Sequence, residues 1–110
     1  MAIVKPAENE IEIYIGTSFD FSAAIDIGAD PTAVEFELSI RTPTETLLFN
    51  AASTPPLLKT VLANVATLTC ALDSDITAKI PPHRASRYTV FEVGSKKNAW
   101  LKGGIRGRVV

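Results

Sequence analysis

Residues 34–41 alternate strictly between apolar and polar side chains, and this alternation constrains the fold more than any other feature of the sequence. The apolar members are Val34, Phe36, Leu38 and Ile40, and the polar members are Glu35, Glu37, Ser39 and Arg41. Successive side chains of a strand point to opposite faces of its sheet. A period of two over eight residues therefore predicts a strand with one face in a core and the other in water.

Further segments of strand character recur along the chain, with turn-forming residues between them. We predict strands at residues 11–15, 18–26, 46–50, 65–72, 86–93 and 99–110, with 46–50 near a sheet edge and 94–98 as a hairpin loop. The core face of the strand at 65–72 is predicted to carry Ala66, Leu68, Cys70 and Leu72. Residues 51–63 stay open, because Pro55-Pro56 interrupts a central strand and the residues after it suit a strand, a helical turn or a loop.

A single segment has helical character. Residues 73–80 begin with Asp73, which suits an N-cap, and Pro81-Pro82 follows them, so we expect one or two helical turns that cross between two sheets. About seven short strands with one helical turn before the strand at 86–93 predict an all-β fold, an immunoglobulin-like antiparallel β-sandwich. Because the 110 residues are 46% hydrophobic, we expect residues 1–110 to form one domain around one core.

Charge and hydropathy exclude two classes of partner. The formal net charge is -1, so no overall positive field attracts nucleic acid or anionic lipid. No apolar run reaches the roughly 18 residues of a membrane span, and the first ten residues lack the order of a signal peptide. We therefore expect no nucleic-acid partner, no membrane partner, and a protein that is made and kept in a cytoplasm or released by lysis.

The residues that carry catalysis or bind cofactors are scarce. The chain has one cysteine, Cys70, and one histidine, His83, which furnish neither a disulfide nor a zinc site. Cys70 lies within a predicted strand and is expected to be buried and inert, and His83 lies in a proline-flanked loop and is expected to be exposed. The aspartates at 26–30 and 73–75 suit turns and caps better than a calcium site. We predict a protein with no enzymatic activity and no cofactor.

The charges are segregated along the chain. Residues 1–50 carry nine acids and two bases, whereas residues 81–110 carry seven bases and one acid. In one interpretation Glu35 and Glu37 form ion pairs with bases on neighbouring strands of the same sheet. In the other, acidic and basic surfaces lie on different flanks and join one copy to the next, so that association weakens as salt rises.

Four landmarks spread along the chain carry a resemblance to a known family. They are Gly16-Thr-Ser-Phe-Asp-Phe21, Ile40-Arg41, Tyr88-Thr-Val-Phe-Glu92 and Trp100-Leu-Lys-Gly-Gly-Ile-Arg-Gly-Arg-Val109. Together they resemble the small immunoglobulin-like domains of tailed bacteriophages, and are similar to the N-terminal domain of baseplate upper proteins and to related tail or fibre attachment proteins. Many such domains are fused to a fibre or receptor-binding region. The sequence stops at Val110 without one, so we expect an accessory protein of the tail or head.

The resemblance implies a non-enzymatic virion structural protein, made in the host bacterial cytoplasm, whose partners are other virion proteins and further copies of itself. Function would then reside in interface residues. We nominate Lys96, Lys97 and Lys102 with Trp100 near the predicted hairpin loop, and Glu35 and Glu37 as the opposing surface. The alternative is a carbohydrate-binding module, since small β-sandwiches bind sugars through exposed aromatic rings. Trp100, Tyr14 and Tyr88 are its only tryptophan and tyrosines, and Tyr88 is expected to be buried.

Overall fold

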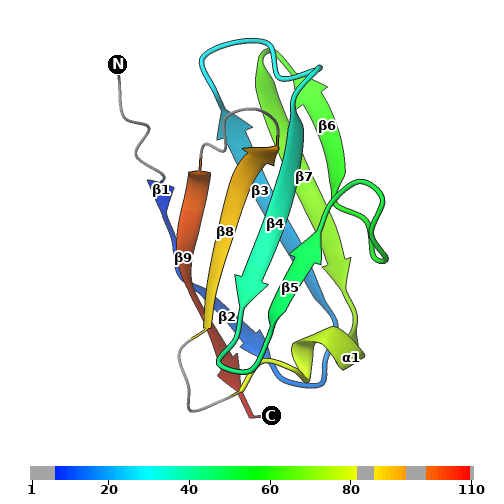
Figure 1. Ribbon diagram of the computed structural model, residues 1–110, viewed down its shortest axis with the longest axis vertical. Coiled ribbons are helices and arrows are strands. Elements are labelled where there is room, and N and C mark those ends of the chain that lie inside the picture. The colour runs from blue at the N-terminus through cyan, green and yellow to red at the C-terminus, as the bar shows by residue number, and fades with distance from the viewer. Residues whose placement is uncertain (1–6, 82–85, 94–98, 110) are drawn as a thin grey trace.

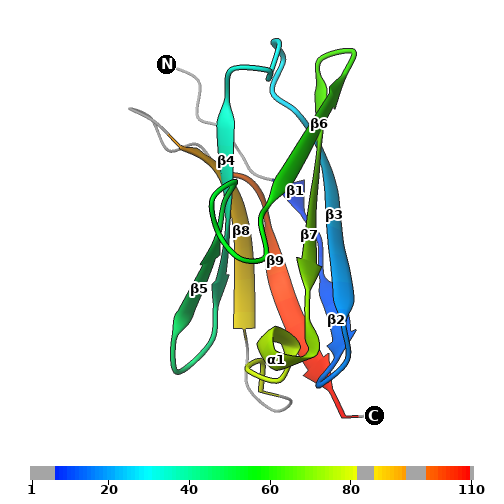
Figure 2. The ribbon, with the colours of Figure 1, turned by 90° about the vertical axis from the view of Figure 1, so that its right-hand side faces the viewer.

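The chain folds as two β-sheets packed face to face, as a computed structural model that describes residues 7–81, 86–93 and 99–109 shows (Figures 1 and 2). The strands are β1 (Ala7–Glu8), β2 (Ile11–Tyr14), β3 (Phe19–Asp26), β4 (Glu35–Arg41), β5 (Thr46–Phe49), β6 (Leu58–Leu62), β7 (Val65–Leu72), β8 (Ser86–Val93) and β9 (Ala99–Arg108). The six-stranded sheet has the order β1-β9-β8-β4-β5, with β2 also on β9, and the three-stranded sheet has the order β3-β7-β6. The predicted all-β sandwich is confirmed.

The strand predicted at residues 11–15 is β2, and a two-residue strand that was not predicted, β1, precedes it. Both β1 and β2 pair with β9 in parallel, whereas every other pairing in the two sheets is antiparallel. The Tyr88 hydroxyl donates a 2.6 Å hydrogen bond to the carbonyl oxygen of Asn9, which lies between β1 and β2. Gly103 lies directly beneath, and a Cβ there would overlap the same carbonyl oxygen. A tyrosine and a glycine thus fix the path of the N-terminal strand against β9.

The segment that the sequence left open contains β6. It forms a hairpin with β7 through the two residues Ala63 and Asn64, whose φ angles are 50° and 66°. Two consecutive left-handed residues make a turn whose twist matches that of the flanking strands. Among the described strands β5 pairs with β4 alone, so its predicted position at a sheet edge is confirmed.

The short helix α1 (Ser74–Thr77) joins β7 to the other sheet and confirms the predicted helical turn. Asp73 is its N-cap, and the carboxylate accepts a 2.9 Å hydrogen bond from the Ile76 amide. The buried Thr77 hydroxyl donates to the Thr17 carbonyl at 2.7 Å and accepts from the Gly16 amide at 3.1 Å. The helix is therefore tied to the turn after β2, and it closes one end of the sandwich (Figure 2).

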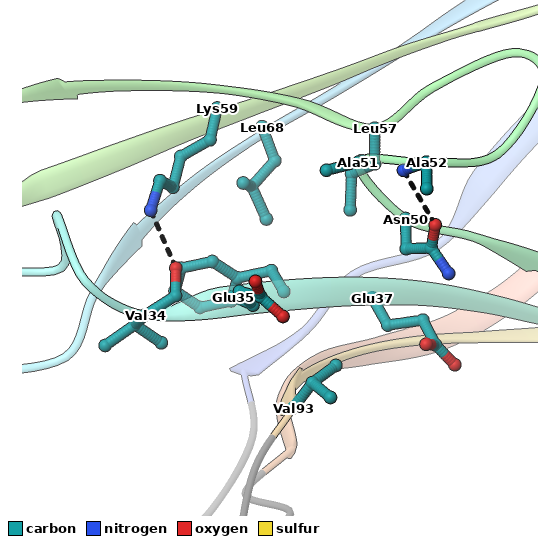
Figure 3. Close-up of a pocket in the computed structure, with 11 residues that line it drawn as sticks. Val34, Glu35, Glu37, Asn50, Ala51, Ala52, Leu57, Lys59, Leu68 and Val93 are labelled. Atoms are coloured by element: carbon teal, nitrogen blue, oxygen red, sulfur yellow. Dashed lines mark hydrogen bonds between the residues drawn. The ribbon is translucent and has the colours of Figure 1, made fainter.

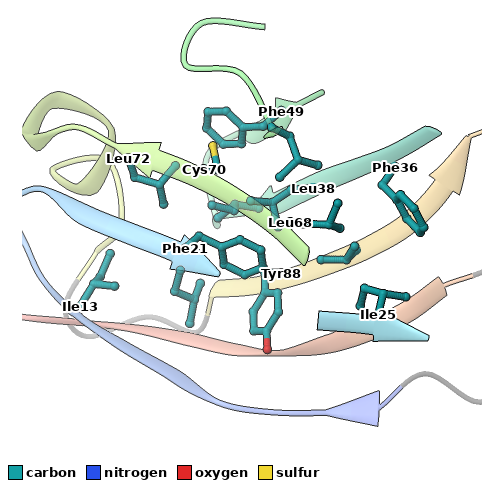
Figure 4. Close-up of a cluster of buried hydrophobic side chains, with 14 of the residues drawn as sticks. Ile13, Phe21, Ile25, Phe36, Leu38, Phe49, Leu68, Cys70, Leu72 and Tyr88 are labelled. Atoms are coloured by element: carbon teal, nitrogen blue, oxygen red, sulfur yellow. The ribbon is translucent and has the colours of Figure 1, made fainter. Parts of the chain in front are cut away.

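One hydrophobic core fills the space between the sheets (Figure 4). Its buried members include Phe21 and Ile25 from β3, Phe36, Leu38 and Ile40 from β4, Ala66, Leu68, Cys70 and Leu72 from β7, and Tyr88 and Val90 from β8. The rings of Phe21 and Tyr88 meet edge to face with centroids 5.9 Å apart. The core faces predicted for residues 34–41 and 65–72 are confirmed, except that Val34 precedes β4 and is half-buried.

Candidate interaction surface

The outer face of the six-stranded sheet carries acids together with five of the seven lysine and arginine residues that the structure describes. The strand registers and the alternation of burial place these residues on it: Glu12, Tyr14, Glu35, Glu37, Ser39, Arg41, Leu48, Arg87, Thr89, Phe91, Val93, Lys102, Arg106 and Arg108. We call this surface the charged face. No described element packs on it, so its side chains meet solvent or a partner.

Glu35 and Glu37 lie on the charged face, as predicted, but not beside bases. Antiparallel pairing sets Glu35 opposite Val93 and Glu37 opposite Phe91. Neither carboxylate forms an ion pair with any residue in the described ranges, so ion pairing between these two glutamates and bases on neighbouring strands is wrong within that part of the chain. Two acids beside two partly exposed apolar side chains have the mixed character of a protein-contact patch.

The ion pair that the structure does show lies at the other end of this face. The Arg108 guanidinium donates two 2.9 Å hydrogen bonds to the Glu12 carboxylate, from β9 to the parallel β2. This bidentate contact lowers the pKa of the Glu12 carboxyl below its ordinary value. An acid from the first half of the chain thus pairs with a base from the last, but through β2 and β9 rather than through β4 and β8.

The basic candidates fall into two groups, one described by the structure and one outside the described residues. Lys102 lies opposite Thr89 on the charged face and is half-buried. Lys102 shares that face with Glu35 and Glu37, because its strand β9 is separated from β4 by β8 alone. The predicted opposition of an acidic surface to one that contains Lys102 is therefore wrong. Lys96, Lys97 and the loop histidine His83 lie outside the described residues, as does the predicted hairpin loop at 94–98.

Trp100 faces a different environment from Lys102. It sits where the β8–β9 register shifts, packs against the core and is half-buried. Its Nε1 donates a 3.4 Å hydrogen bond to the Glu92 carboxylate. Glu92 in turn lies opposite the buried Phe36, so this contact is on the inner side of the sheet. Trp100 therefore offers only part of its ring to a partner.

The outer face of the three-stranded sheet is chemically different. Its residues are Asp20, Ser22, Ala24, Asp26, Leu58, Thr60, Leu62, Val65, Thr67, Thr69 and Ala71. We call this surface the threonine face. It carries two acids and, among the described residues, neither lysine nor arginine. The described bases of residues 81–110, Arg87, Lys102, Arg106 and Arg108, therefore all lie on the charged face.

A hollow of about 320 Å³ opens between β4 and the β5–β6 connection (Figure 3). Its lining is mainly apolar, with Glu35, Glu37 and Asn50 among the polar members. At one side Lys59 donates hydrogen bonds to three carbonyl oxygens, of Pro31 at 3.0 Å, Thr32 at 2.9 Å and Val34 at 2.7 Å. This lysine links β6 to the segment that leads into β4. This role of Lys59 could not be predicted from the sequence, because residues 51–63 suited a strand, a helical turn or a loop equally.

The described residues offer no centre for metal or thiol chemistry. They contain no group of three or more histidine, cysteine, aspartate or glutamate side chains that could hold a metal ion. Cys70 is buried as predicted, and burial raises the pKa of its thiol to about 11. No helix among these residues has the length and apolar character needed to cross a membrane.

No family model and no curated protein matches the sequence. Among solved structures, a voltage-gated sodium channel β subunit from a photo-crosslinking analysis of multimeric cell-adhesive interactions aligns over 100% of this chain and 98% of its own. Its TM-score is 0.59 at 12% identity. The extracellular domain of the sodium channel beta4 subunit scores 0.49 at 15% identity, covering 100% of this chain and 91% of its own. The M1 domain of titin scores 0.45 at 12% identity, covering 93% and 91%.

The first of these similarities defines the class of the chain by its fold alone. Together with the two-sheet topology it makes the chain an immunoglobulin-like β-sandwich, as the strand pattern predicted. A fold of this class hosts many unrelated functions, so function has to be argued from the surfaces.

Proposed function

We propose that the chain is a non-enzymatic structural protein of a tailed-bacteriophage virion, an accessory of the tail, baseplate or head that acts through protein–protein contacts. Its partners are other virion proteins and further copies of itself. It is made in the host bacterial cytoplasm and resides in the virion.

The observation that carries the contact role is the charged face. Four neighbouring strands, β9, β8, β4 and β5, present a broad surface on which charged side chains surround the exposed Leu48 and the half-buried Phe91. Apolar side chains among charged ones suit a specific protein contact. Burial of the apolar area stabilises the complex, and the charges determine which partner binds. A solved structure with a similar fold comes from a study of multimeric cell-adhesive interactions, which supports the use of such a sandwich for contacts.

The phage assignment rests on the sequence landmarks. The landmark residues Tyr88 and Gly103 meet at the Asn9 carbonyl, where they hold β1 and β2 on β9. The landmark segment 16–21 holds the turn at Gly16 and Thr17, which Thr77 ties to α1, and the first residues of β3. These landmark residues therefore help to determine how this sandwich folds. This favours a shared architecture with the phage domains over a chance match of residues.

The carbohydrate-binding alternative draws less support from the aromatic side chains. Tyr88 is buried in the core, and Trp100 is half-buried with its Nε1 bonded to Glu92. Tyr14 is 59% exposed, and a single tyrosine ring makes a small platform for a sugar.

Mass spectrometry of gradient-purified phage particles tests the proposal. We expect the chain in the particles at a fixed ratio to the other virion proteins, and its absence from particles of a phage that encodes it would contradict the virion role. Particles grown with the Glu35→Lys/Glu37→Lys chain should contain less of it. The matched control is Asp20→Lys/Asp26→Lys, which makes the same charge change on the threonine face and should be incorporated normally.

A further inference from the structure

The strand β6 forms a free edge of the three-stranded sheet. It pairs with β7 on one side and has no strand on the other among the described residues (Figure 1, upper right). Leu58 and Leu62 at its two ends are 58% and 80% exposed. A flat edge flanked by exposed leucines is a template for pairing with another strand.

The hairpin turn determines which backbone groups this edge presents. In a two-residue turn the flanking residues, here Leu62 and Val65, form a hydrogen-bonded pair, and such pairs then alternate with non-bonded ones. Leu58, Thr60 and Leu62 therefore direct their amides and carbonyls toward β7. Lys59 and Val61 direct theirs to the free edge, where no described backbone group receives them.

The sequence of β6 is self-complementary about its centre. In an antiparallel pair of two copies with a two-fold axis at Thr60, Leu58 of each copy lies opposite Leu62 of the other. Lys59 lies opposite Val61, and both belong to the set that faces the free edge, so each such pair exchanges two hydrogen bonds. The same axis therefore pairs the exposed leucines and satisfies the backbone groups of the edge.

The usual protection of such an edge is absent. Natural sheets guard their edges with a charged side chain, above all lysine, with proline or with a bulge. β6 contains neither proline nor a register shift, and its only charged residue is Lys59. The Lys59 ammonium is held by the carbonyls of Pro31, Thr32 and Val34, on the inner side of the sheet. Its charge is therefore withheld from an incoming strand.

We propose that β6 pairs antiparallel with β6 of a second copy about a two-fold axis at Thr60, which joins two three-stranded sheets into one continuous sheet. This site lies on the opposite sheet from the charged face and does not depend on the virion role. The strand is short, so the contact is weak in dilute solution and gains occupancy where an assembly holds copies close together.

Disulfide trapping of Thr60→Cys tests the axis directly. Facing residues of a non-bonded antiparallel pair have Cα atoms about 4.5 Å apart, within the range that a disulfide spans. Under mild oxidation we expect Thr60→Cys to form a covalent dimer at least tenfold more than Thr69→Cys. Thr69 is exposed on the same face, but in the middle strand β7, so it is the matched control. The native Cys70 is buried and present in both variants.

Charge at the leucines provides the second readout. A Thr60→Cys variant that also carries Leu58→Lys and Leu62→Lys should form no covalent dimer. Mixed with a Thr60→Cys variant that carries Leu58→Glu and Leu62→Glu, it should form a dimer with one chain of each kind. The Glu35→Lys/Glu37→Lys changes should leave trapping unchanged. Equal trapping of Thr60→Cys and Thr69→Cys, or trapping that the lysines do not reduce, would overturn the pairing. A Thr60→Cys adduct with a different protein in preference to a second copy would also overturn it.

Discussion

The two outer faces of the sandwich differ in almost every property that governs association. The charged face mixes acids and bases with partly exposed apolar groups, whereas the threonine face carries Asp20 and Asp26 and no described base. The difference arises from strand order, because β9 and β8 bring the basic end of the chain between the acidic strands β2 and β4. The charges that are segregated along the sequence are thus mixed on the charged face, while the described part of the threonine face carries acids alone.

The two faces should therefore associate by different physical means. Contacts on the charged face involve exposed ions, which salt screens over a Debye length of about 10 Å at 0.1 M. Pairing at the β6 edge of the threonine face uses backbone hydrogen bonds and leucines, on which screening has little effect.

The largest effect is expected at Gly103, which holds the β2 side of the charged face in place. In Gly103→Ala the new Cβ overlaps the Asn9 carbonyl, and it also comes within 3.1 Å of the Tyr88 ring. We expect a loss of about 3 kcal/mol in the free energy of unfolding, measured by urea denaturation. The neighbouring Gly104→Ala is the control, since its Cβ meets only the mobile end of Glu10, at 3.6 Å, and the Ser86 carbonyl oxygen at 4.0 Å. Similar losses in both variants would contradict this role of Gly103.

The next effect concerns the link between the two sheets. Lys59→Met keeps the aliphatic stem but leaves the carbonyls of Pro31, Thr32 and Val34 without their shared donor. Because hydrogen bonds to a charged group are the stronger kind, we expect a loss of about 2 kcal/mol in the free energy of unfolding. Lys79→Met, at an exposed position after α1, should be neutral. Thermal unfolding of the two variants side by side measures the difference.

Salt should separate the two modes of association. Between about 50 mM and about 500 mM salt, the affinity of complexes that form through the charged face should fall by at least several-fold. The yield of the Thr60→Cys disulfide dimer should stay constant over the same range. Light scattering coupled to size exclusion, at two protein concentrations, measures the first, and non-reducing gels measure the second. A trapping yield that falls in parallel with the complexes would remove the distinction between the faces.

The smallest effect is expected at the exposed pair of Glu12 and Arg108. The folded-state pKa of Glu12 lies below its ordinary value, so the stabilisation by the pair is present above that ordinary value and is lost as the pH falls through the lowered pKa. Arg108→Leu should return the Glu12 pKa toward its ordinary value, as NMR titration would show, with a barely measurable change in Tm. An unchanged Glu12 pKa would show that the pair does not persist in solution.

The sequence predicted those parts of the fold that a strict alternation specifies. Leu38 and Ile40 in β4, and Leu68 and Cys70 in β7, are buried as their spacing required. The alternation of apolar and polar residues could not predict β6, because its inner positions are Lys59 and Val61. A lysine on the inner face disguises the period of two, and its acceptor carbonyls lie more than twenty residues earlier in the chain.

The surface was less predictable than the core. The sequence placed Glu35 and Glu37 on an outer face, but their neighbours Val93 and Phe91 follow from the β4–β8 register, which alternation alone does not specify. Trp100 was grouped with Lys102 by proximity in sequence, whereas the register shift near Val90 and Phe91 turns its ring toward the core.

We propose that the charged face is the surface on which this chain binds other virion proteins. Cross-linking mass spectrometry of purified phage particles, with one reagent for lysines and one for carboxylates, tests it most directly. We predict links from Lys102, Glu35 and Glu37 to other virion proteins, and none from Asp20 or Asp26. Links to other proteins that come from Asp20 and Asp26, with none from the charged face, would contradict the account.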